Sequence, residues 1–125
     1  MRFVTKTLHA YLDYPVAFAL VALPFALGLG ASNPVALFLS PVVGVAAFLM
    51  TLFTDHHLGV VRVLPYRLHL AVDFAVGVLF LAAPFALGFA GIDAIYYWAN
   101  GAAVVAVIAL SKPEEASVTA NFADA

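Results

Sequence analysis

The chain has 125 residues, of which 66% are hydrophobic and 10% charged, and its mean hydropathy is +1.08. Soluble domains are about 45–50% apolar and about 25% charged, so a water-soluble globule of this length would lack the polar surface to cover itself. The composition excludes a cytosolic enzyme and a disordered chain, and it indicates an integral membrane protein. The net charge of −2 gives no basic patch for nucleic acid, and the lack of cysteine excludes disulfides and thiolate metal sites.

Three stretches of the chain carry no Asp, Glu, Lys or Arg, and they indicate where it crosses a membrane. They cover positions 14–54, 74–92 and 94–111. Because a spanning helix needs about 20 apolar residues, the longest stretch holds two spans, which separate at the turn-forming segment 28–34. The sequence predicts an all-α, polytopic membrane protein with four transmembrane helices, over 7–29, 34–54, 67–90 and 93–111.

The start of the first span has features of a secretory signal peptide, since Arg2 and Lys6 precede a run of small residues. Asp13 and Pro15 interrupt the apolar core that a signal peptide needs. We therefore expect this segment to be retained as the first helix of a single membrane domain covering residues 1–125.

The basic residues indicate how the four spans are oriented. All five lie in the N-terminal segment, in the loop between the second and third spans, or in the C-terminal segment: Arg2, Lys6, Arg62, Arg67 and Lys112. Since positive charge is enriched on the cytoplasmic side, we predict a multi-pass protein of the inner (cytoplasmic) membrane with both termini in the cytoplasm. The polar segment 113–125 is predicted to be a mobile tail.

The first predicted helix aligns with the third without a gap when Leu8 is placed against Leu68. Positions 8–28 read LHAYLDYPVAFALVALPFALG and positions 68–88 read LHLAVDFAVGVLFLAAPFALG, with ten of 21 positions identical. A hydrophobic composition does not explain a shared His, a shared Asp and a shared Pro-Phe-Ala-Leu-Gly run. The second and fourth helices are less alike, with Gly44 and Gly101 as candidate equivalents at a different offset. The sequence predicts two tandem helical hairpins, over about 5–55 and 65–112.

Each predicted repeat contains an even number of spans, so both copies enter the membrane from the same side. They are then related by a pseudo-twofold axis along the membrane normal. This relation places His9 at the same depth as His69, and Asp13 at the same depth as Asp73, toward the cytoplasmic side.

The two hairpins, each with a Pro-aromatic pair late in its first helix, resemble the SPW repeat family of small bacterial membrane proteins. The family is named for a Ser-Pro-Trp motif, which is replaced here by Leu23-Pro24-Phe25 and Ala83-Pro84-Phe85. The only tryptophan, Trp98, belongs to the fourth helix. The resemblance covers about residues 8–111 and implies the four-helix architecture, but it brings no catalytic residue.

The repeated residues fall on one face of the first helix when they are placed at about 100° per residue. Relative to Asp13, His9 lies about 40° to one side, whereas Pro24 lies about 20° and Gly28 about 60° to the other. In the second copy His69, Asp73, Pro84 and Gly88 occupy the same angles. Because close helix contact in lipid uses small residues and a few polar links, we expect this face to be buried, either against the other repeat or against a partner chain. The two prolines are expected to kink their helices and to free the carbonyls of Leu20 and Phe80.

The pairs His9/Asp13 and His69/Asp73 are the candidate functional polar groups, because a carboxyl group at the edge of hydrocarbon is costly. One interpretation is structural, with headgroup-level bonds between helices. A second is a shared proton-carrying or ligand-binding site. A third is a bis-histidine haem or metal site, since histidines at equal depth on facing helices suit axial ligation. Against haem, the bulky side chains Tyr11, Tyr14 and Phe74 are expected to fill the space between the helices.

Two further groups are candidates of a weaker kind. His56 and His57 follow Asp55 in the middle loop and would bind a metal only if another ligand approached. Tyr96, Tyr97 and Trp98 begin the fourth span, where aromatic residues usually anchor at the membrane interface.

These observations favour a non-enzymatic membrane protein without a cofactor, a scaffold or accessory subunit that packs with itself or with a larger membrane complex. The alternative is a haem-binding, metal-binding or proton-handling protein that uses the paired His and Asp. A minimal transporter or channel subunit is a weaker alternative, because 125 residues leave little room for a water path. The predicted partner in every case is the lipid bilayer, with no nucleic acid.

Overall fold

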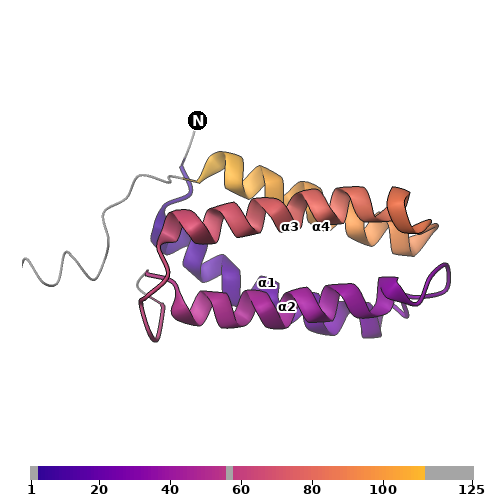
Figure 1. Cartoon of the computed structure of the whole chain (residues 1–125), viewed down its shortest axis with the longest axis horizontal. Helices are drawn as coiled ribbons and strands as arrows, with labels where there is room; N and C mark the ends of the chain where they lie inside the picture. The colour runs from indigo at the N-terminus through magenta and orange to yellow at the C-terminus, as the bar shows by residue number, and fades with distance from the viewer. Residues whose placement is uncertain (1–2, 56–57, 112–125) are drawn as a thin grey trace, which may run out of the picture.

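The computed structural model describes residues 3–55 and 58–111, which form four helices (Figure 1). The helices are α1 (Lys6–Ala26), α2 (Val35–Phe53), α3 (Tyr66–Leu87) and α4 (Ile92–Leu110). Each is long and apolar enough to cross a membrane. The described residues contain no strand beyond two isolated bridges. The predicted all-α class with four spans is confirmed, and it fits a multi-pass membrane protein. The predicted tail 113–125 and the loop residues His56 and His57 lie outside the described residues.

The helices form two antiparallel hairpins that lie side by side. Helix α1 packs along α2 and α3 packs along α4, whereas close backbone contacts between the two hairpins are few. Figure 1 shows the α1–α2 and α3–α4 turns at one end of the molecule, here named the turn end. The first described residues and the α2–α3 connection lie at the opposite end, here named the terminal end.

One glycine in each hairpin permits the two helices to approach closely. A Cβ atom on Gly44 would lie 2.9 Å from the Ala17 carbonyl oxygen of α1. A Cβ atom on Gly101 would likewise lie 2.9 Å from the Gly77 carbonyl oxygen of α3. Both glycines are buried, so the backbones pack against each other as small residues allow in lipid.

Helices α1 and α3 each end three residues earlier than the sequence predicts, at Ala26 and Leu87. The cause is the backbone of Gly28 and Gly88, whose φ values of 64° and 69° lie in the left-handed region and stop the helix. Within this chain both glycines are exposed, and apart from their chain neighbours no atom lies within 4 Å of a Cβ built on either of them. They therefore do not pack against the other hairpin, and burial of this end of the face against a partner chain stays a prediction.

The hydrophobic core between the hairpins is concentrated toward the turn end. Phe80 and Tyr97 are almost fully buried there, with ring centroids 4.7 Å apart. The prediction that Tyr96 and Tyr97 anchor at the membrane interface is wrong, because their exposed fractions are 5% and 0%. Their hydroxyl groups bond across to the other hairpin, at Ser40 and at the Ala36 carbonyl. Each tyrosine hydroxyl therefore has a hydrogen-bond partner inside the bundle.

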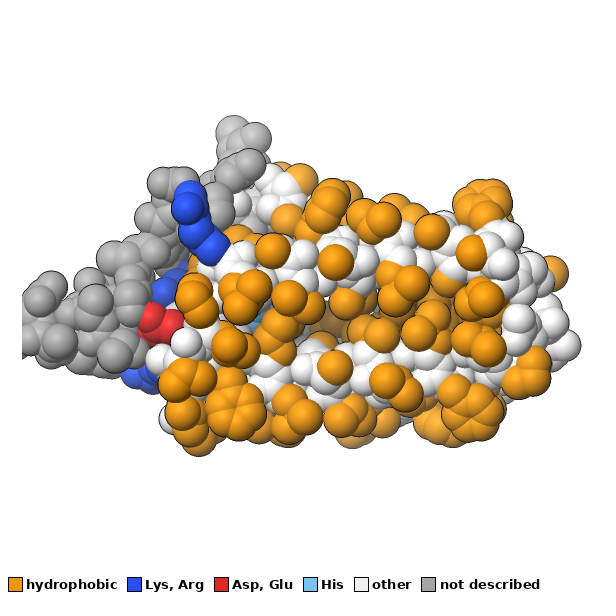
Figure 2. All heavy atoms as spheres, viewed as in Figure 1, with side chains coloured by type: hydrophobic (Ala, Val, Ile, Leu, Met, Phe, Trp, Pro, Cys, Tyr) orange, Lys and Arg blue, Asp and Glu red, His pale blue; other side chains and the backbone are white. Residues whose placement is uncertain are grey.

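The outer surface of the helices is covered by large apolar side chains, as Figure 2 shows for one face. Phe18 is 74% exposed and Phe85 is 79% exposed. A soluble monomer rarely presents so continuous an apolar surface, and this surface is the one expected to contact lipid.

Candidate functional site

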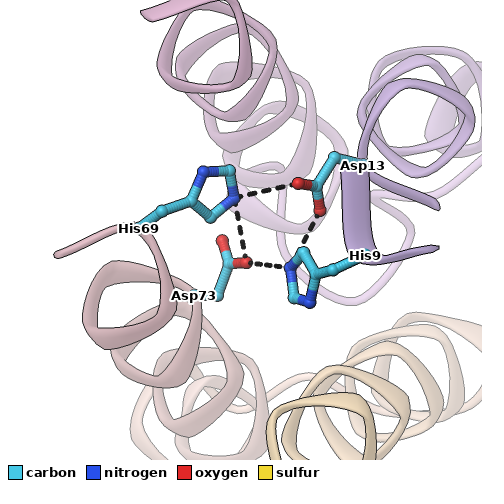
Figure 3. A group of neighbouring side chains, drawn as sticks. All are labelled: His9, Asp13, His69 and Asp73. Carbon is cyan, nitrogen blue, oxygen red and sulfur yellow. Dashed lines mark hydrogen bonds and ion pairs between the residues drawn. The ribbon is translucent and has the colours of Figure 1, made fainter. Parts of the chain in front are cut away.

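Four polar side chains meet between the hairpins near the terminal end (Figure 3). Helix α1 contributes His9 and Asp13, and helix α3 contributes His69 and Asp73. Within each helix the pair is separated by four residues, which places both side chains on one face. We name this group the His/Asp tetrad. Its members are the four candidate polar residues of the sequence, and the structure brings them together in one cluster.

The tetrad is held by close contacts between histidine nitrogens and carboxylate oxygens. His9 Nε2 lies 3.1 Å from Asp13 Oδ1 and 3.1 Å from Asp73 Oδ2. His69 Nε2 lies 3.2 Å from Asp13 Oδ2 and 3.2 Å from Asp73 Oδ2. Each imidazole thus contacts one carboxylate of its own helix and one of the other hairpin. One ligand atom from each of the four residues lies within 4.8 Å of the other three.

The two imidazoles are the most buried members of the tetrad. The exposed fractions of the His9 and His69 side chains are 3% and 1%, against 13% for Asp13 and 18% for Asp73. The imidazole planes are nearly perpendicular, at 89°, with ring centroids 5.6 Å apart. The Nε2 atoms therefore point toward a common centre from different directions.

The outer nitrogen of each histidine contacts a hydroxyl group at the end of the second helix of the other hairpin. His9 Nδ1 of α1 lies 3.1 Å from Ser111 Oγ, just after α4, and His69 Nδ1 of α3 lies 2.7 Å from Thr54 Oγ1, just after α2. Both contacts therefore cross from one hairpin to the other. Ser111 donates its proton to the Val107 carbonyl, and Thr54 donates its proton to the Met50 carbonyl.

The direction of these hydroxyl bonds determines the protonation pattern of the imidazoles. Each hydroxyl has one proton, which is already donated within its own helix, so its oxygen accepts from the histidine. Nδ1 is therefore the protonated nitrogen of His9 and of His69. In a neutral imidazole the Nε2 atom then carries a lone pair and faces two carboxylates, which also carry only lone pairs. The centre of the tetrad thus requires protons, on Nε2 or on a carboxylate oxygen, or a metal ion.

Thr54 and Ser111 are not among the residues predicted from the sequence, although a signal for them exists. Thr54 follows Gly44 by ten residues, and Ser111 follows Gly101 by ten residues. Once the two glycines are aligned, the two hydroxyl residues correspond as well.

On the terminal side, an aromatic ring and a cation cover the tetrad. The Tyr66 ring meets the His9 ring edge to face, with centroids 5.8 Å apart. The Lys6 ammonium lies 5.5 Å from the centre of the Tyr66 ring. Both residues are nearly fully buried, so the tetrad is shielded from that end of the bundle.

The other predicted site residues do not join the tetrad. Pro24 and Pro84 are buried within continuous helices. The Leu20 carbonyl, which Pro24 cannot bond, accepts the Ser40 hydroxyl at 2.8 Å. The expected filling of the space between the hairpins by bulky side chains is wrong for Tyr11 and Phe74, because these are 61% and 49% exposed.

A second polar group joins the hairpins at the turn end. Asp93 is almost fully buried and accepts bonds from Gly30 N at 2.9 Å and from Ser32 N at 3.0 Å. The Ser32 hydroxyl also donates to this carboxylate. Since these partners belong to the α1–α2 turn, Asp93 serves as a structural link.

Comparisons with models of protein families, with curated proteins and with solved structures give no match for the chain. The resemblance to the SPW repeat family stays a prediction.

Proposed function

We propose that this chain is a metal-binding membrane protein, in which the His/Asp tetrad binds one divalent transition-metal ion between the two hairpins. The observation that carries the proposal is the closed set of four nitrogen–oxygen contacts of 3.1–3.2 Å among His9, Asp13, His69 and Asp73. The cluster combines imidazole and carboxylate ligands, which suit zinc and its neighbours among the first-row metals.

The spacing of the ligand atoms supports a small four-coordinate ion. Zn²⁺ binds histidine nitrogen and carboxylate oxygen at about 2.0–2.1 Å in a tetrahedral arrangement, so neighbouring ligand atoms lie about 3.3–3.4 Å apart. The four contacts in the tetrad are within about 0.3 Å of that separation, although they use both oxygens of Asp13. One ligand atom from each residue lies within 4.8 Å of the other three, so the side chains would close around an ion to reach tetrahedral spacing.

The charge of the tetrad supports the same conclusion. Two neutral imidazoles and two carboxylates carry two negative charges, which a divalent ion neutralises. A neutral, ligated cluster is the form that a low-dielectric environment tolerates best. The Thr54 and Ser111 contacts on the outer nitrogens are also typical of metal-binding histidines, whose second nitrogen usually donates to an oxygen.

The arrangement favours a bare ion over haem. Between two axial histidines, a porphyrin needs a wide apolar slot. Here both carboxylates contact the Nε2 atoms directly, so Asp13 and Asp73 occupy the space around the proposed ligand nitrogens.

Such an ion would have a structural consequence, because its ligands come from both hairpins. It would join α1 to α3 at the terminal end, in a bundle whose hairpins make few close backbone contacts with each other. This role agrees with the scaffold or accessory function predicted from the sequence. The matching contributions of the two hairpins support the predicted pseudo-twofold relation.

The second candidate function is proton handling by the same four residues. It is favoured by the Nε2 positions, since protons on both histidines would satisfy the carboxylates in the absence of a metal. The two candidates differ in what occupies the centre of the tetrad, and a metal titration distinguishes them.

The proposal is tested with purified protein in mild detergent, stripped of metal and titrated with Zn²⁺ and with Co²⁺. We expect one ion per chain, and an intense visible absorption of Co²⁺ that indicates tetrahedral coordination. His9→Ala and His69→Ala should each weaken Zn²⁺ binding by more than about 100-fold.

The matched control is the double variant His56→Ala/His57→Ala, which removes two histidines of the middle loop and should leave binding unchanged. If the unaltered protein binds no Zn²⁺ or Co²⁺, or if the loop variant alone loses it, the metal function is wrong. The first of these results would leave proton handling as the function of the tetrad.

A further inference from the structure

A cavity of about 380 Å³ lies between the hairpins, directly next to the tetrad. All four helices line it, through Val16 of α1, Ala47 of α2, Val76 of α3 and Ala103 of α4, among others. Its volume falls within the range of about 300–1,000 Å³ that is typical of small-molecule sites.

The cavity exists because the hairpins touch at both ends but not in between. The aromatic core holds them together toward the turn end, and the tetrad does so near the terminal end. The residues between these two contacts are small or of medium size, such as Ala47, Ala103 and Val104. An apolar cavity of this kind does not hold water well and instead binds apolar molecules.

The cavity is accessible from the surface that faces lipid. Figure 2 shows a hollow between α2 and α3, surrounded by apolar side chains, and histidine atoms are visible between the same helices closer to the terminal end. A molecule dissolved in the bilayer therefore reaches the cavity from the side, without crossing a polar surface.

One end of the cavity is polar, and its chemistry restricts the occupant. Asp13 and Asp73 line it, and they are the two tetrad members with the larger exposed fractions. Asp73 contacts both imidazoles through Oδ2, so that its Oδ1 atom takes no part in those contacts. Oδ1 is an acceptor for a hydroxyl group. A fatty-acid carboxylate has no proton to donate to this acceptor.

The shape of the cavity favours a ring over an extended chain. The part of the cavity beyond the tetrad runs in α1 from Asp13 to Leu20, which are seven residues apart, or about 10 Å along the helix. This apolar part is short and bounded by four helices, and it suits a compact ring. A long acyl chain lying parallel to the helices would extend beyond it.

We propose that this cavity binds the ring of a membrane-soluble quinol, with one ring hydroxyl donating to Asp73 Oδ1 and the apolar tail leaving between α2 and α3. The occupant is neutral, apolar over most of its surface and polar at one end, as the cavity is. The proposal concerns binding only and includes no redox step. It goes beyond the proposed metal function, since the cavity and the Oδ1 acceptor are present with or without an ion.

The test uses a benzoquinol with a decyl tail, kept reduced, and measures its binding to the full chain in detergent by titration calorimetry. We expect saturable binding of one molecule per chain. The dimethyl ether of the same quinol, which has no hydroxyl to donate, should bind about tenfold more weakly.

A matched pair of variants tests the location. Ala103 lines the cavity, whereas the neighbouring Ala102 does not. Ala103→Phe fills the cavity and should weaken quinol binding at least about tenfold, while Ala102→Phe should leave it within about twofold. Zn²⁺ binding measured on the same samples reports separately on the tetrad.

Three results of these titrations would overturn the proposal: no saturable binding of the quinol, an affinity for the dimethyl ether equal to that for the quinol, or a quinol affinity of Ala103→Phe equal to that of the unaltered chain. A phospholipid or fatty acid that is retained at one per chain and that the quinol does not displace would also overturn it. A dimer in which the second copy fills the cavity would also overturn it.

Discussion

At the scale of single residues, two hydroxyl groups determine how the histidines of the tetrad are used. Thr54 and Ser111 each donate to a carbonyl one turn earlier in the chain. Only their lone pairs remain for His69 and His9, so both imidazoles turn Nε2 toward the centre. Second-sphere contacts of this kind orient the ligands of most metal-binding histidines.

Removing these hydroxyl groups should weaken metal binding without removing a ligand. Thr54→Val and Ser111→Ala should each reduce Zn²⁺ affinity about 10–100-fold, as measured by competition with a chelator of known affinity. Thr51→Val is the matched control, because Thr51 makes the same bond within its helix, to Ala47. An equal loss in the control, or no loss in the two variants, would show that the outer contacts do not orient the histidines.

The four tetrad residues were predictable from the sequence because identical residues recur at a constant offset in the first and third helices, as His9 and His69 do. Thr54 and Ser111 were not predictable in this way. The second and fourth helices correspond at a different offset from the first and third, and the two equivalent residues are not identical, since one is threonine and the other serine. The position of Tyr96 and Tyr97 near a helix start predicts that they lie at the membrane interface. Their hydroxyl groups instead form hydrogen bonds with the facing hairpin, inside the bundle.

At the scale of the helices, the length of the apolar stretches was enough to find all four spans. The ends were less accurate because a helix stops where the backbone changes conformation, not where hydropathy falls. Gly28 and Gly88 adopt left-handed φ values, and α1 and α3 therefore end before the apolar stretch does. Composition alone does not reveal which glycine of a small-residue run takes that conformation.

The packing within each hairpin depends on Gly44 and Gly101. Gly101→Val would place a branched side chain against the Gly77 carbonyl, where even a Cβ lies at 2.9 Å. Overpacking of this kind costs about 1–3 kcal/mol, so the free energy of unfolding in detergent should fall by about that amount. Ala102→Val, at the exposed position next to it, should change the free energy by less than about 0.5 kcal/mol. Similar losses in both variants would mean that the close approach of α3 and α4 contributes little.

At the scale of the whole molecule, the predicted orientation places the turn end outside the cell and the α2–α3 connection in the cytoplasm. The chain contains no cysteine, so single cysteines report on their own positions. Ala31→Cys should react with a membrane-impermeant maleimide in right-side-out vesicles, and Val60→Cys only in inverted ones. Both positions are exposed. Labelling of both from the same side would contradict the two-hairpin arrangement, and the reverse pattern would contradict only its orientation.

The link made by Asp93 has a consequence for how the molecule moves. The two hairpins could separate about a hinge only if they were unconnected at one end. Here the Asp93 carboxylate connects them at the turn end, and the tetrad connects them near the terminal end. Any widening of the gap between α2 and α3 must then come from the helices bowing outward at mid-length. A bound molecule would then enter at mid-length of the bundle. Its exchange rate would depend on how easily the four helices bend, and not on breaking the Asp93 contacts or the tetrad contacts.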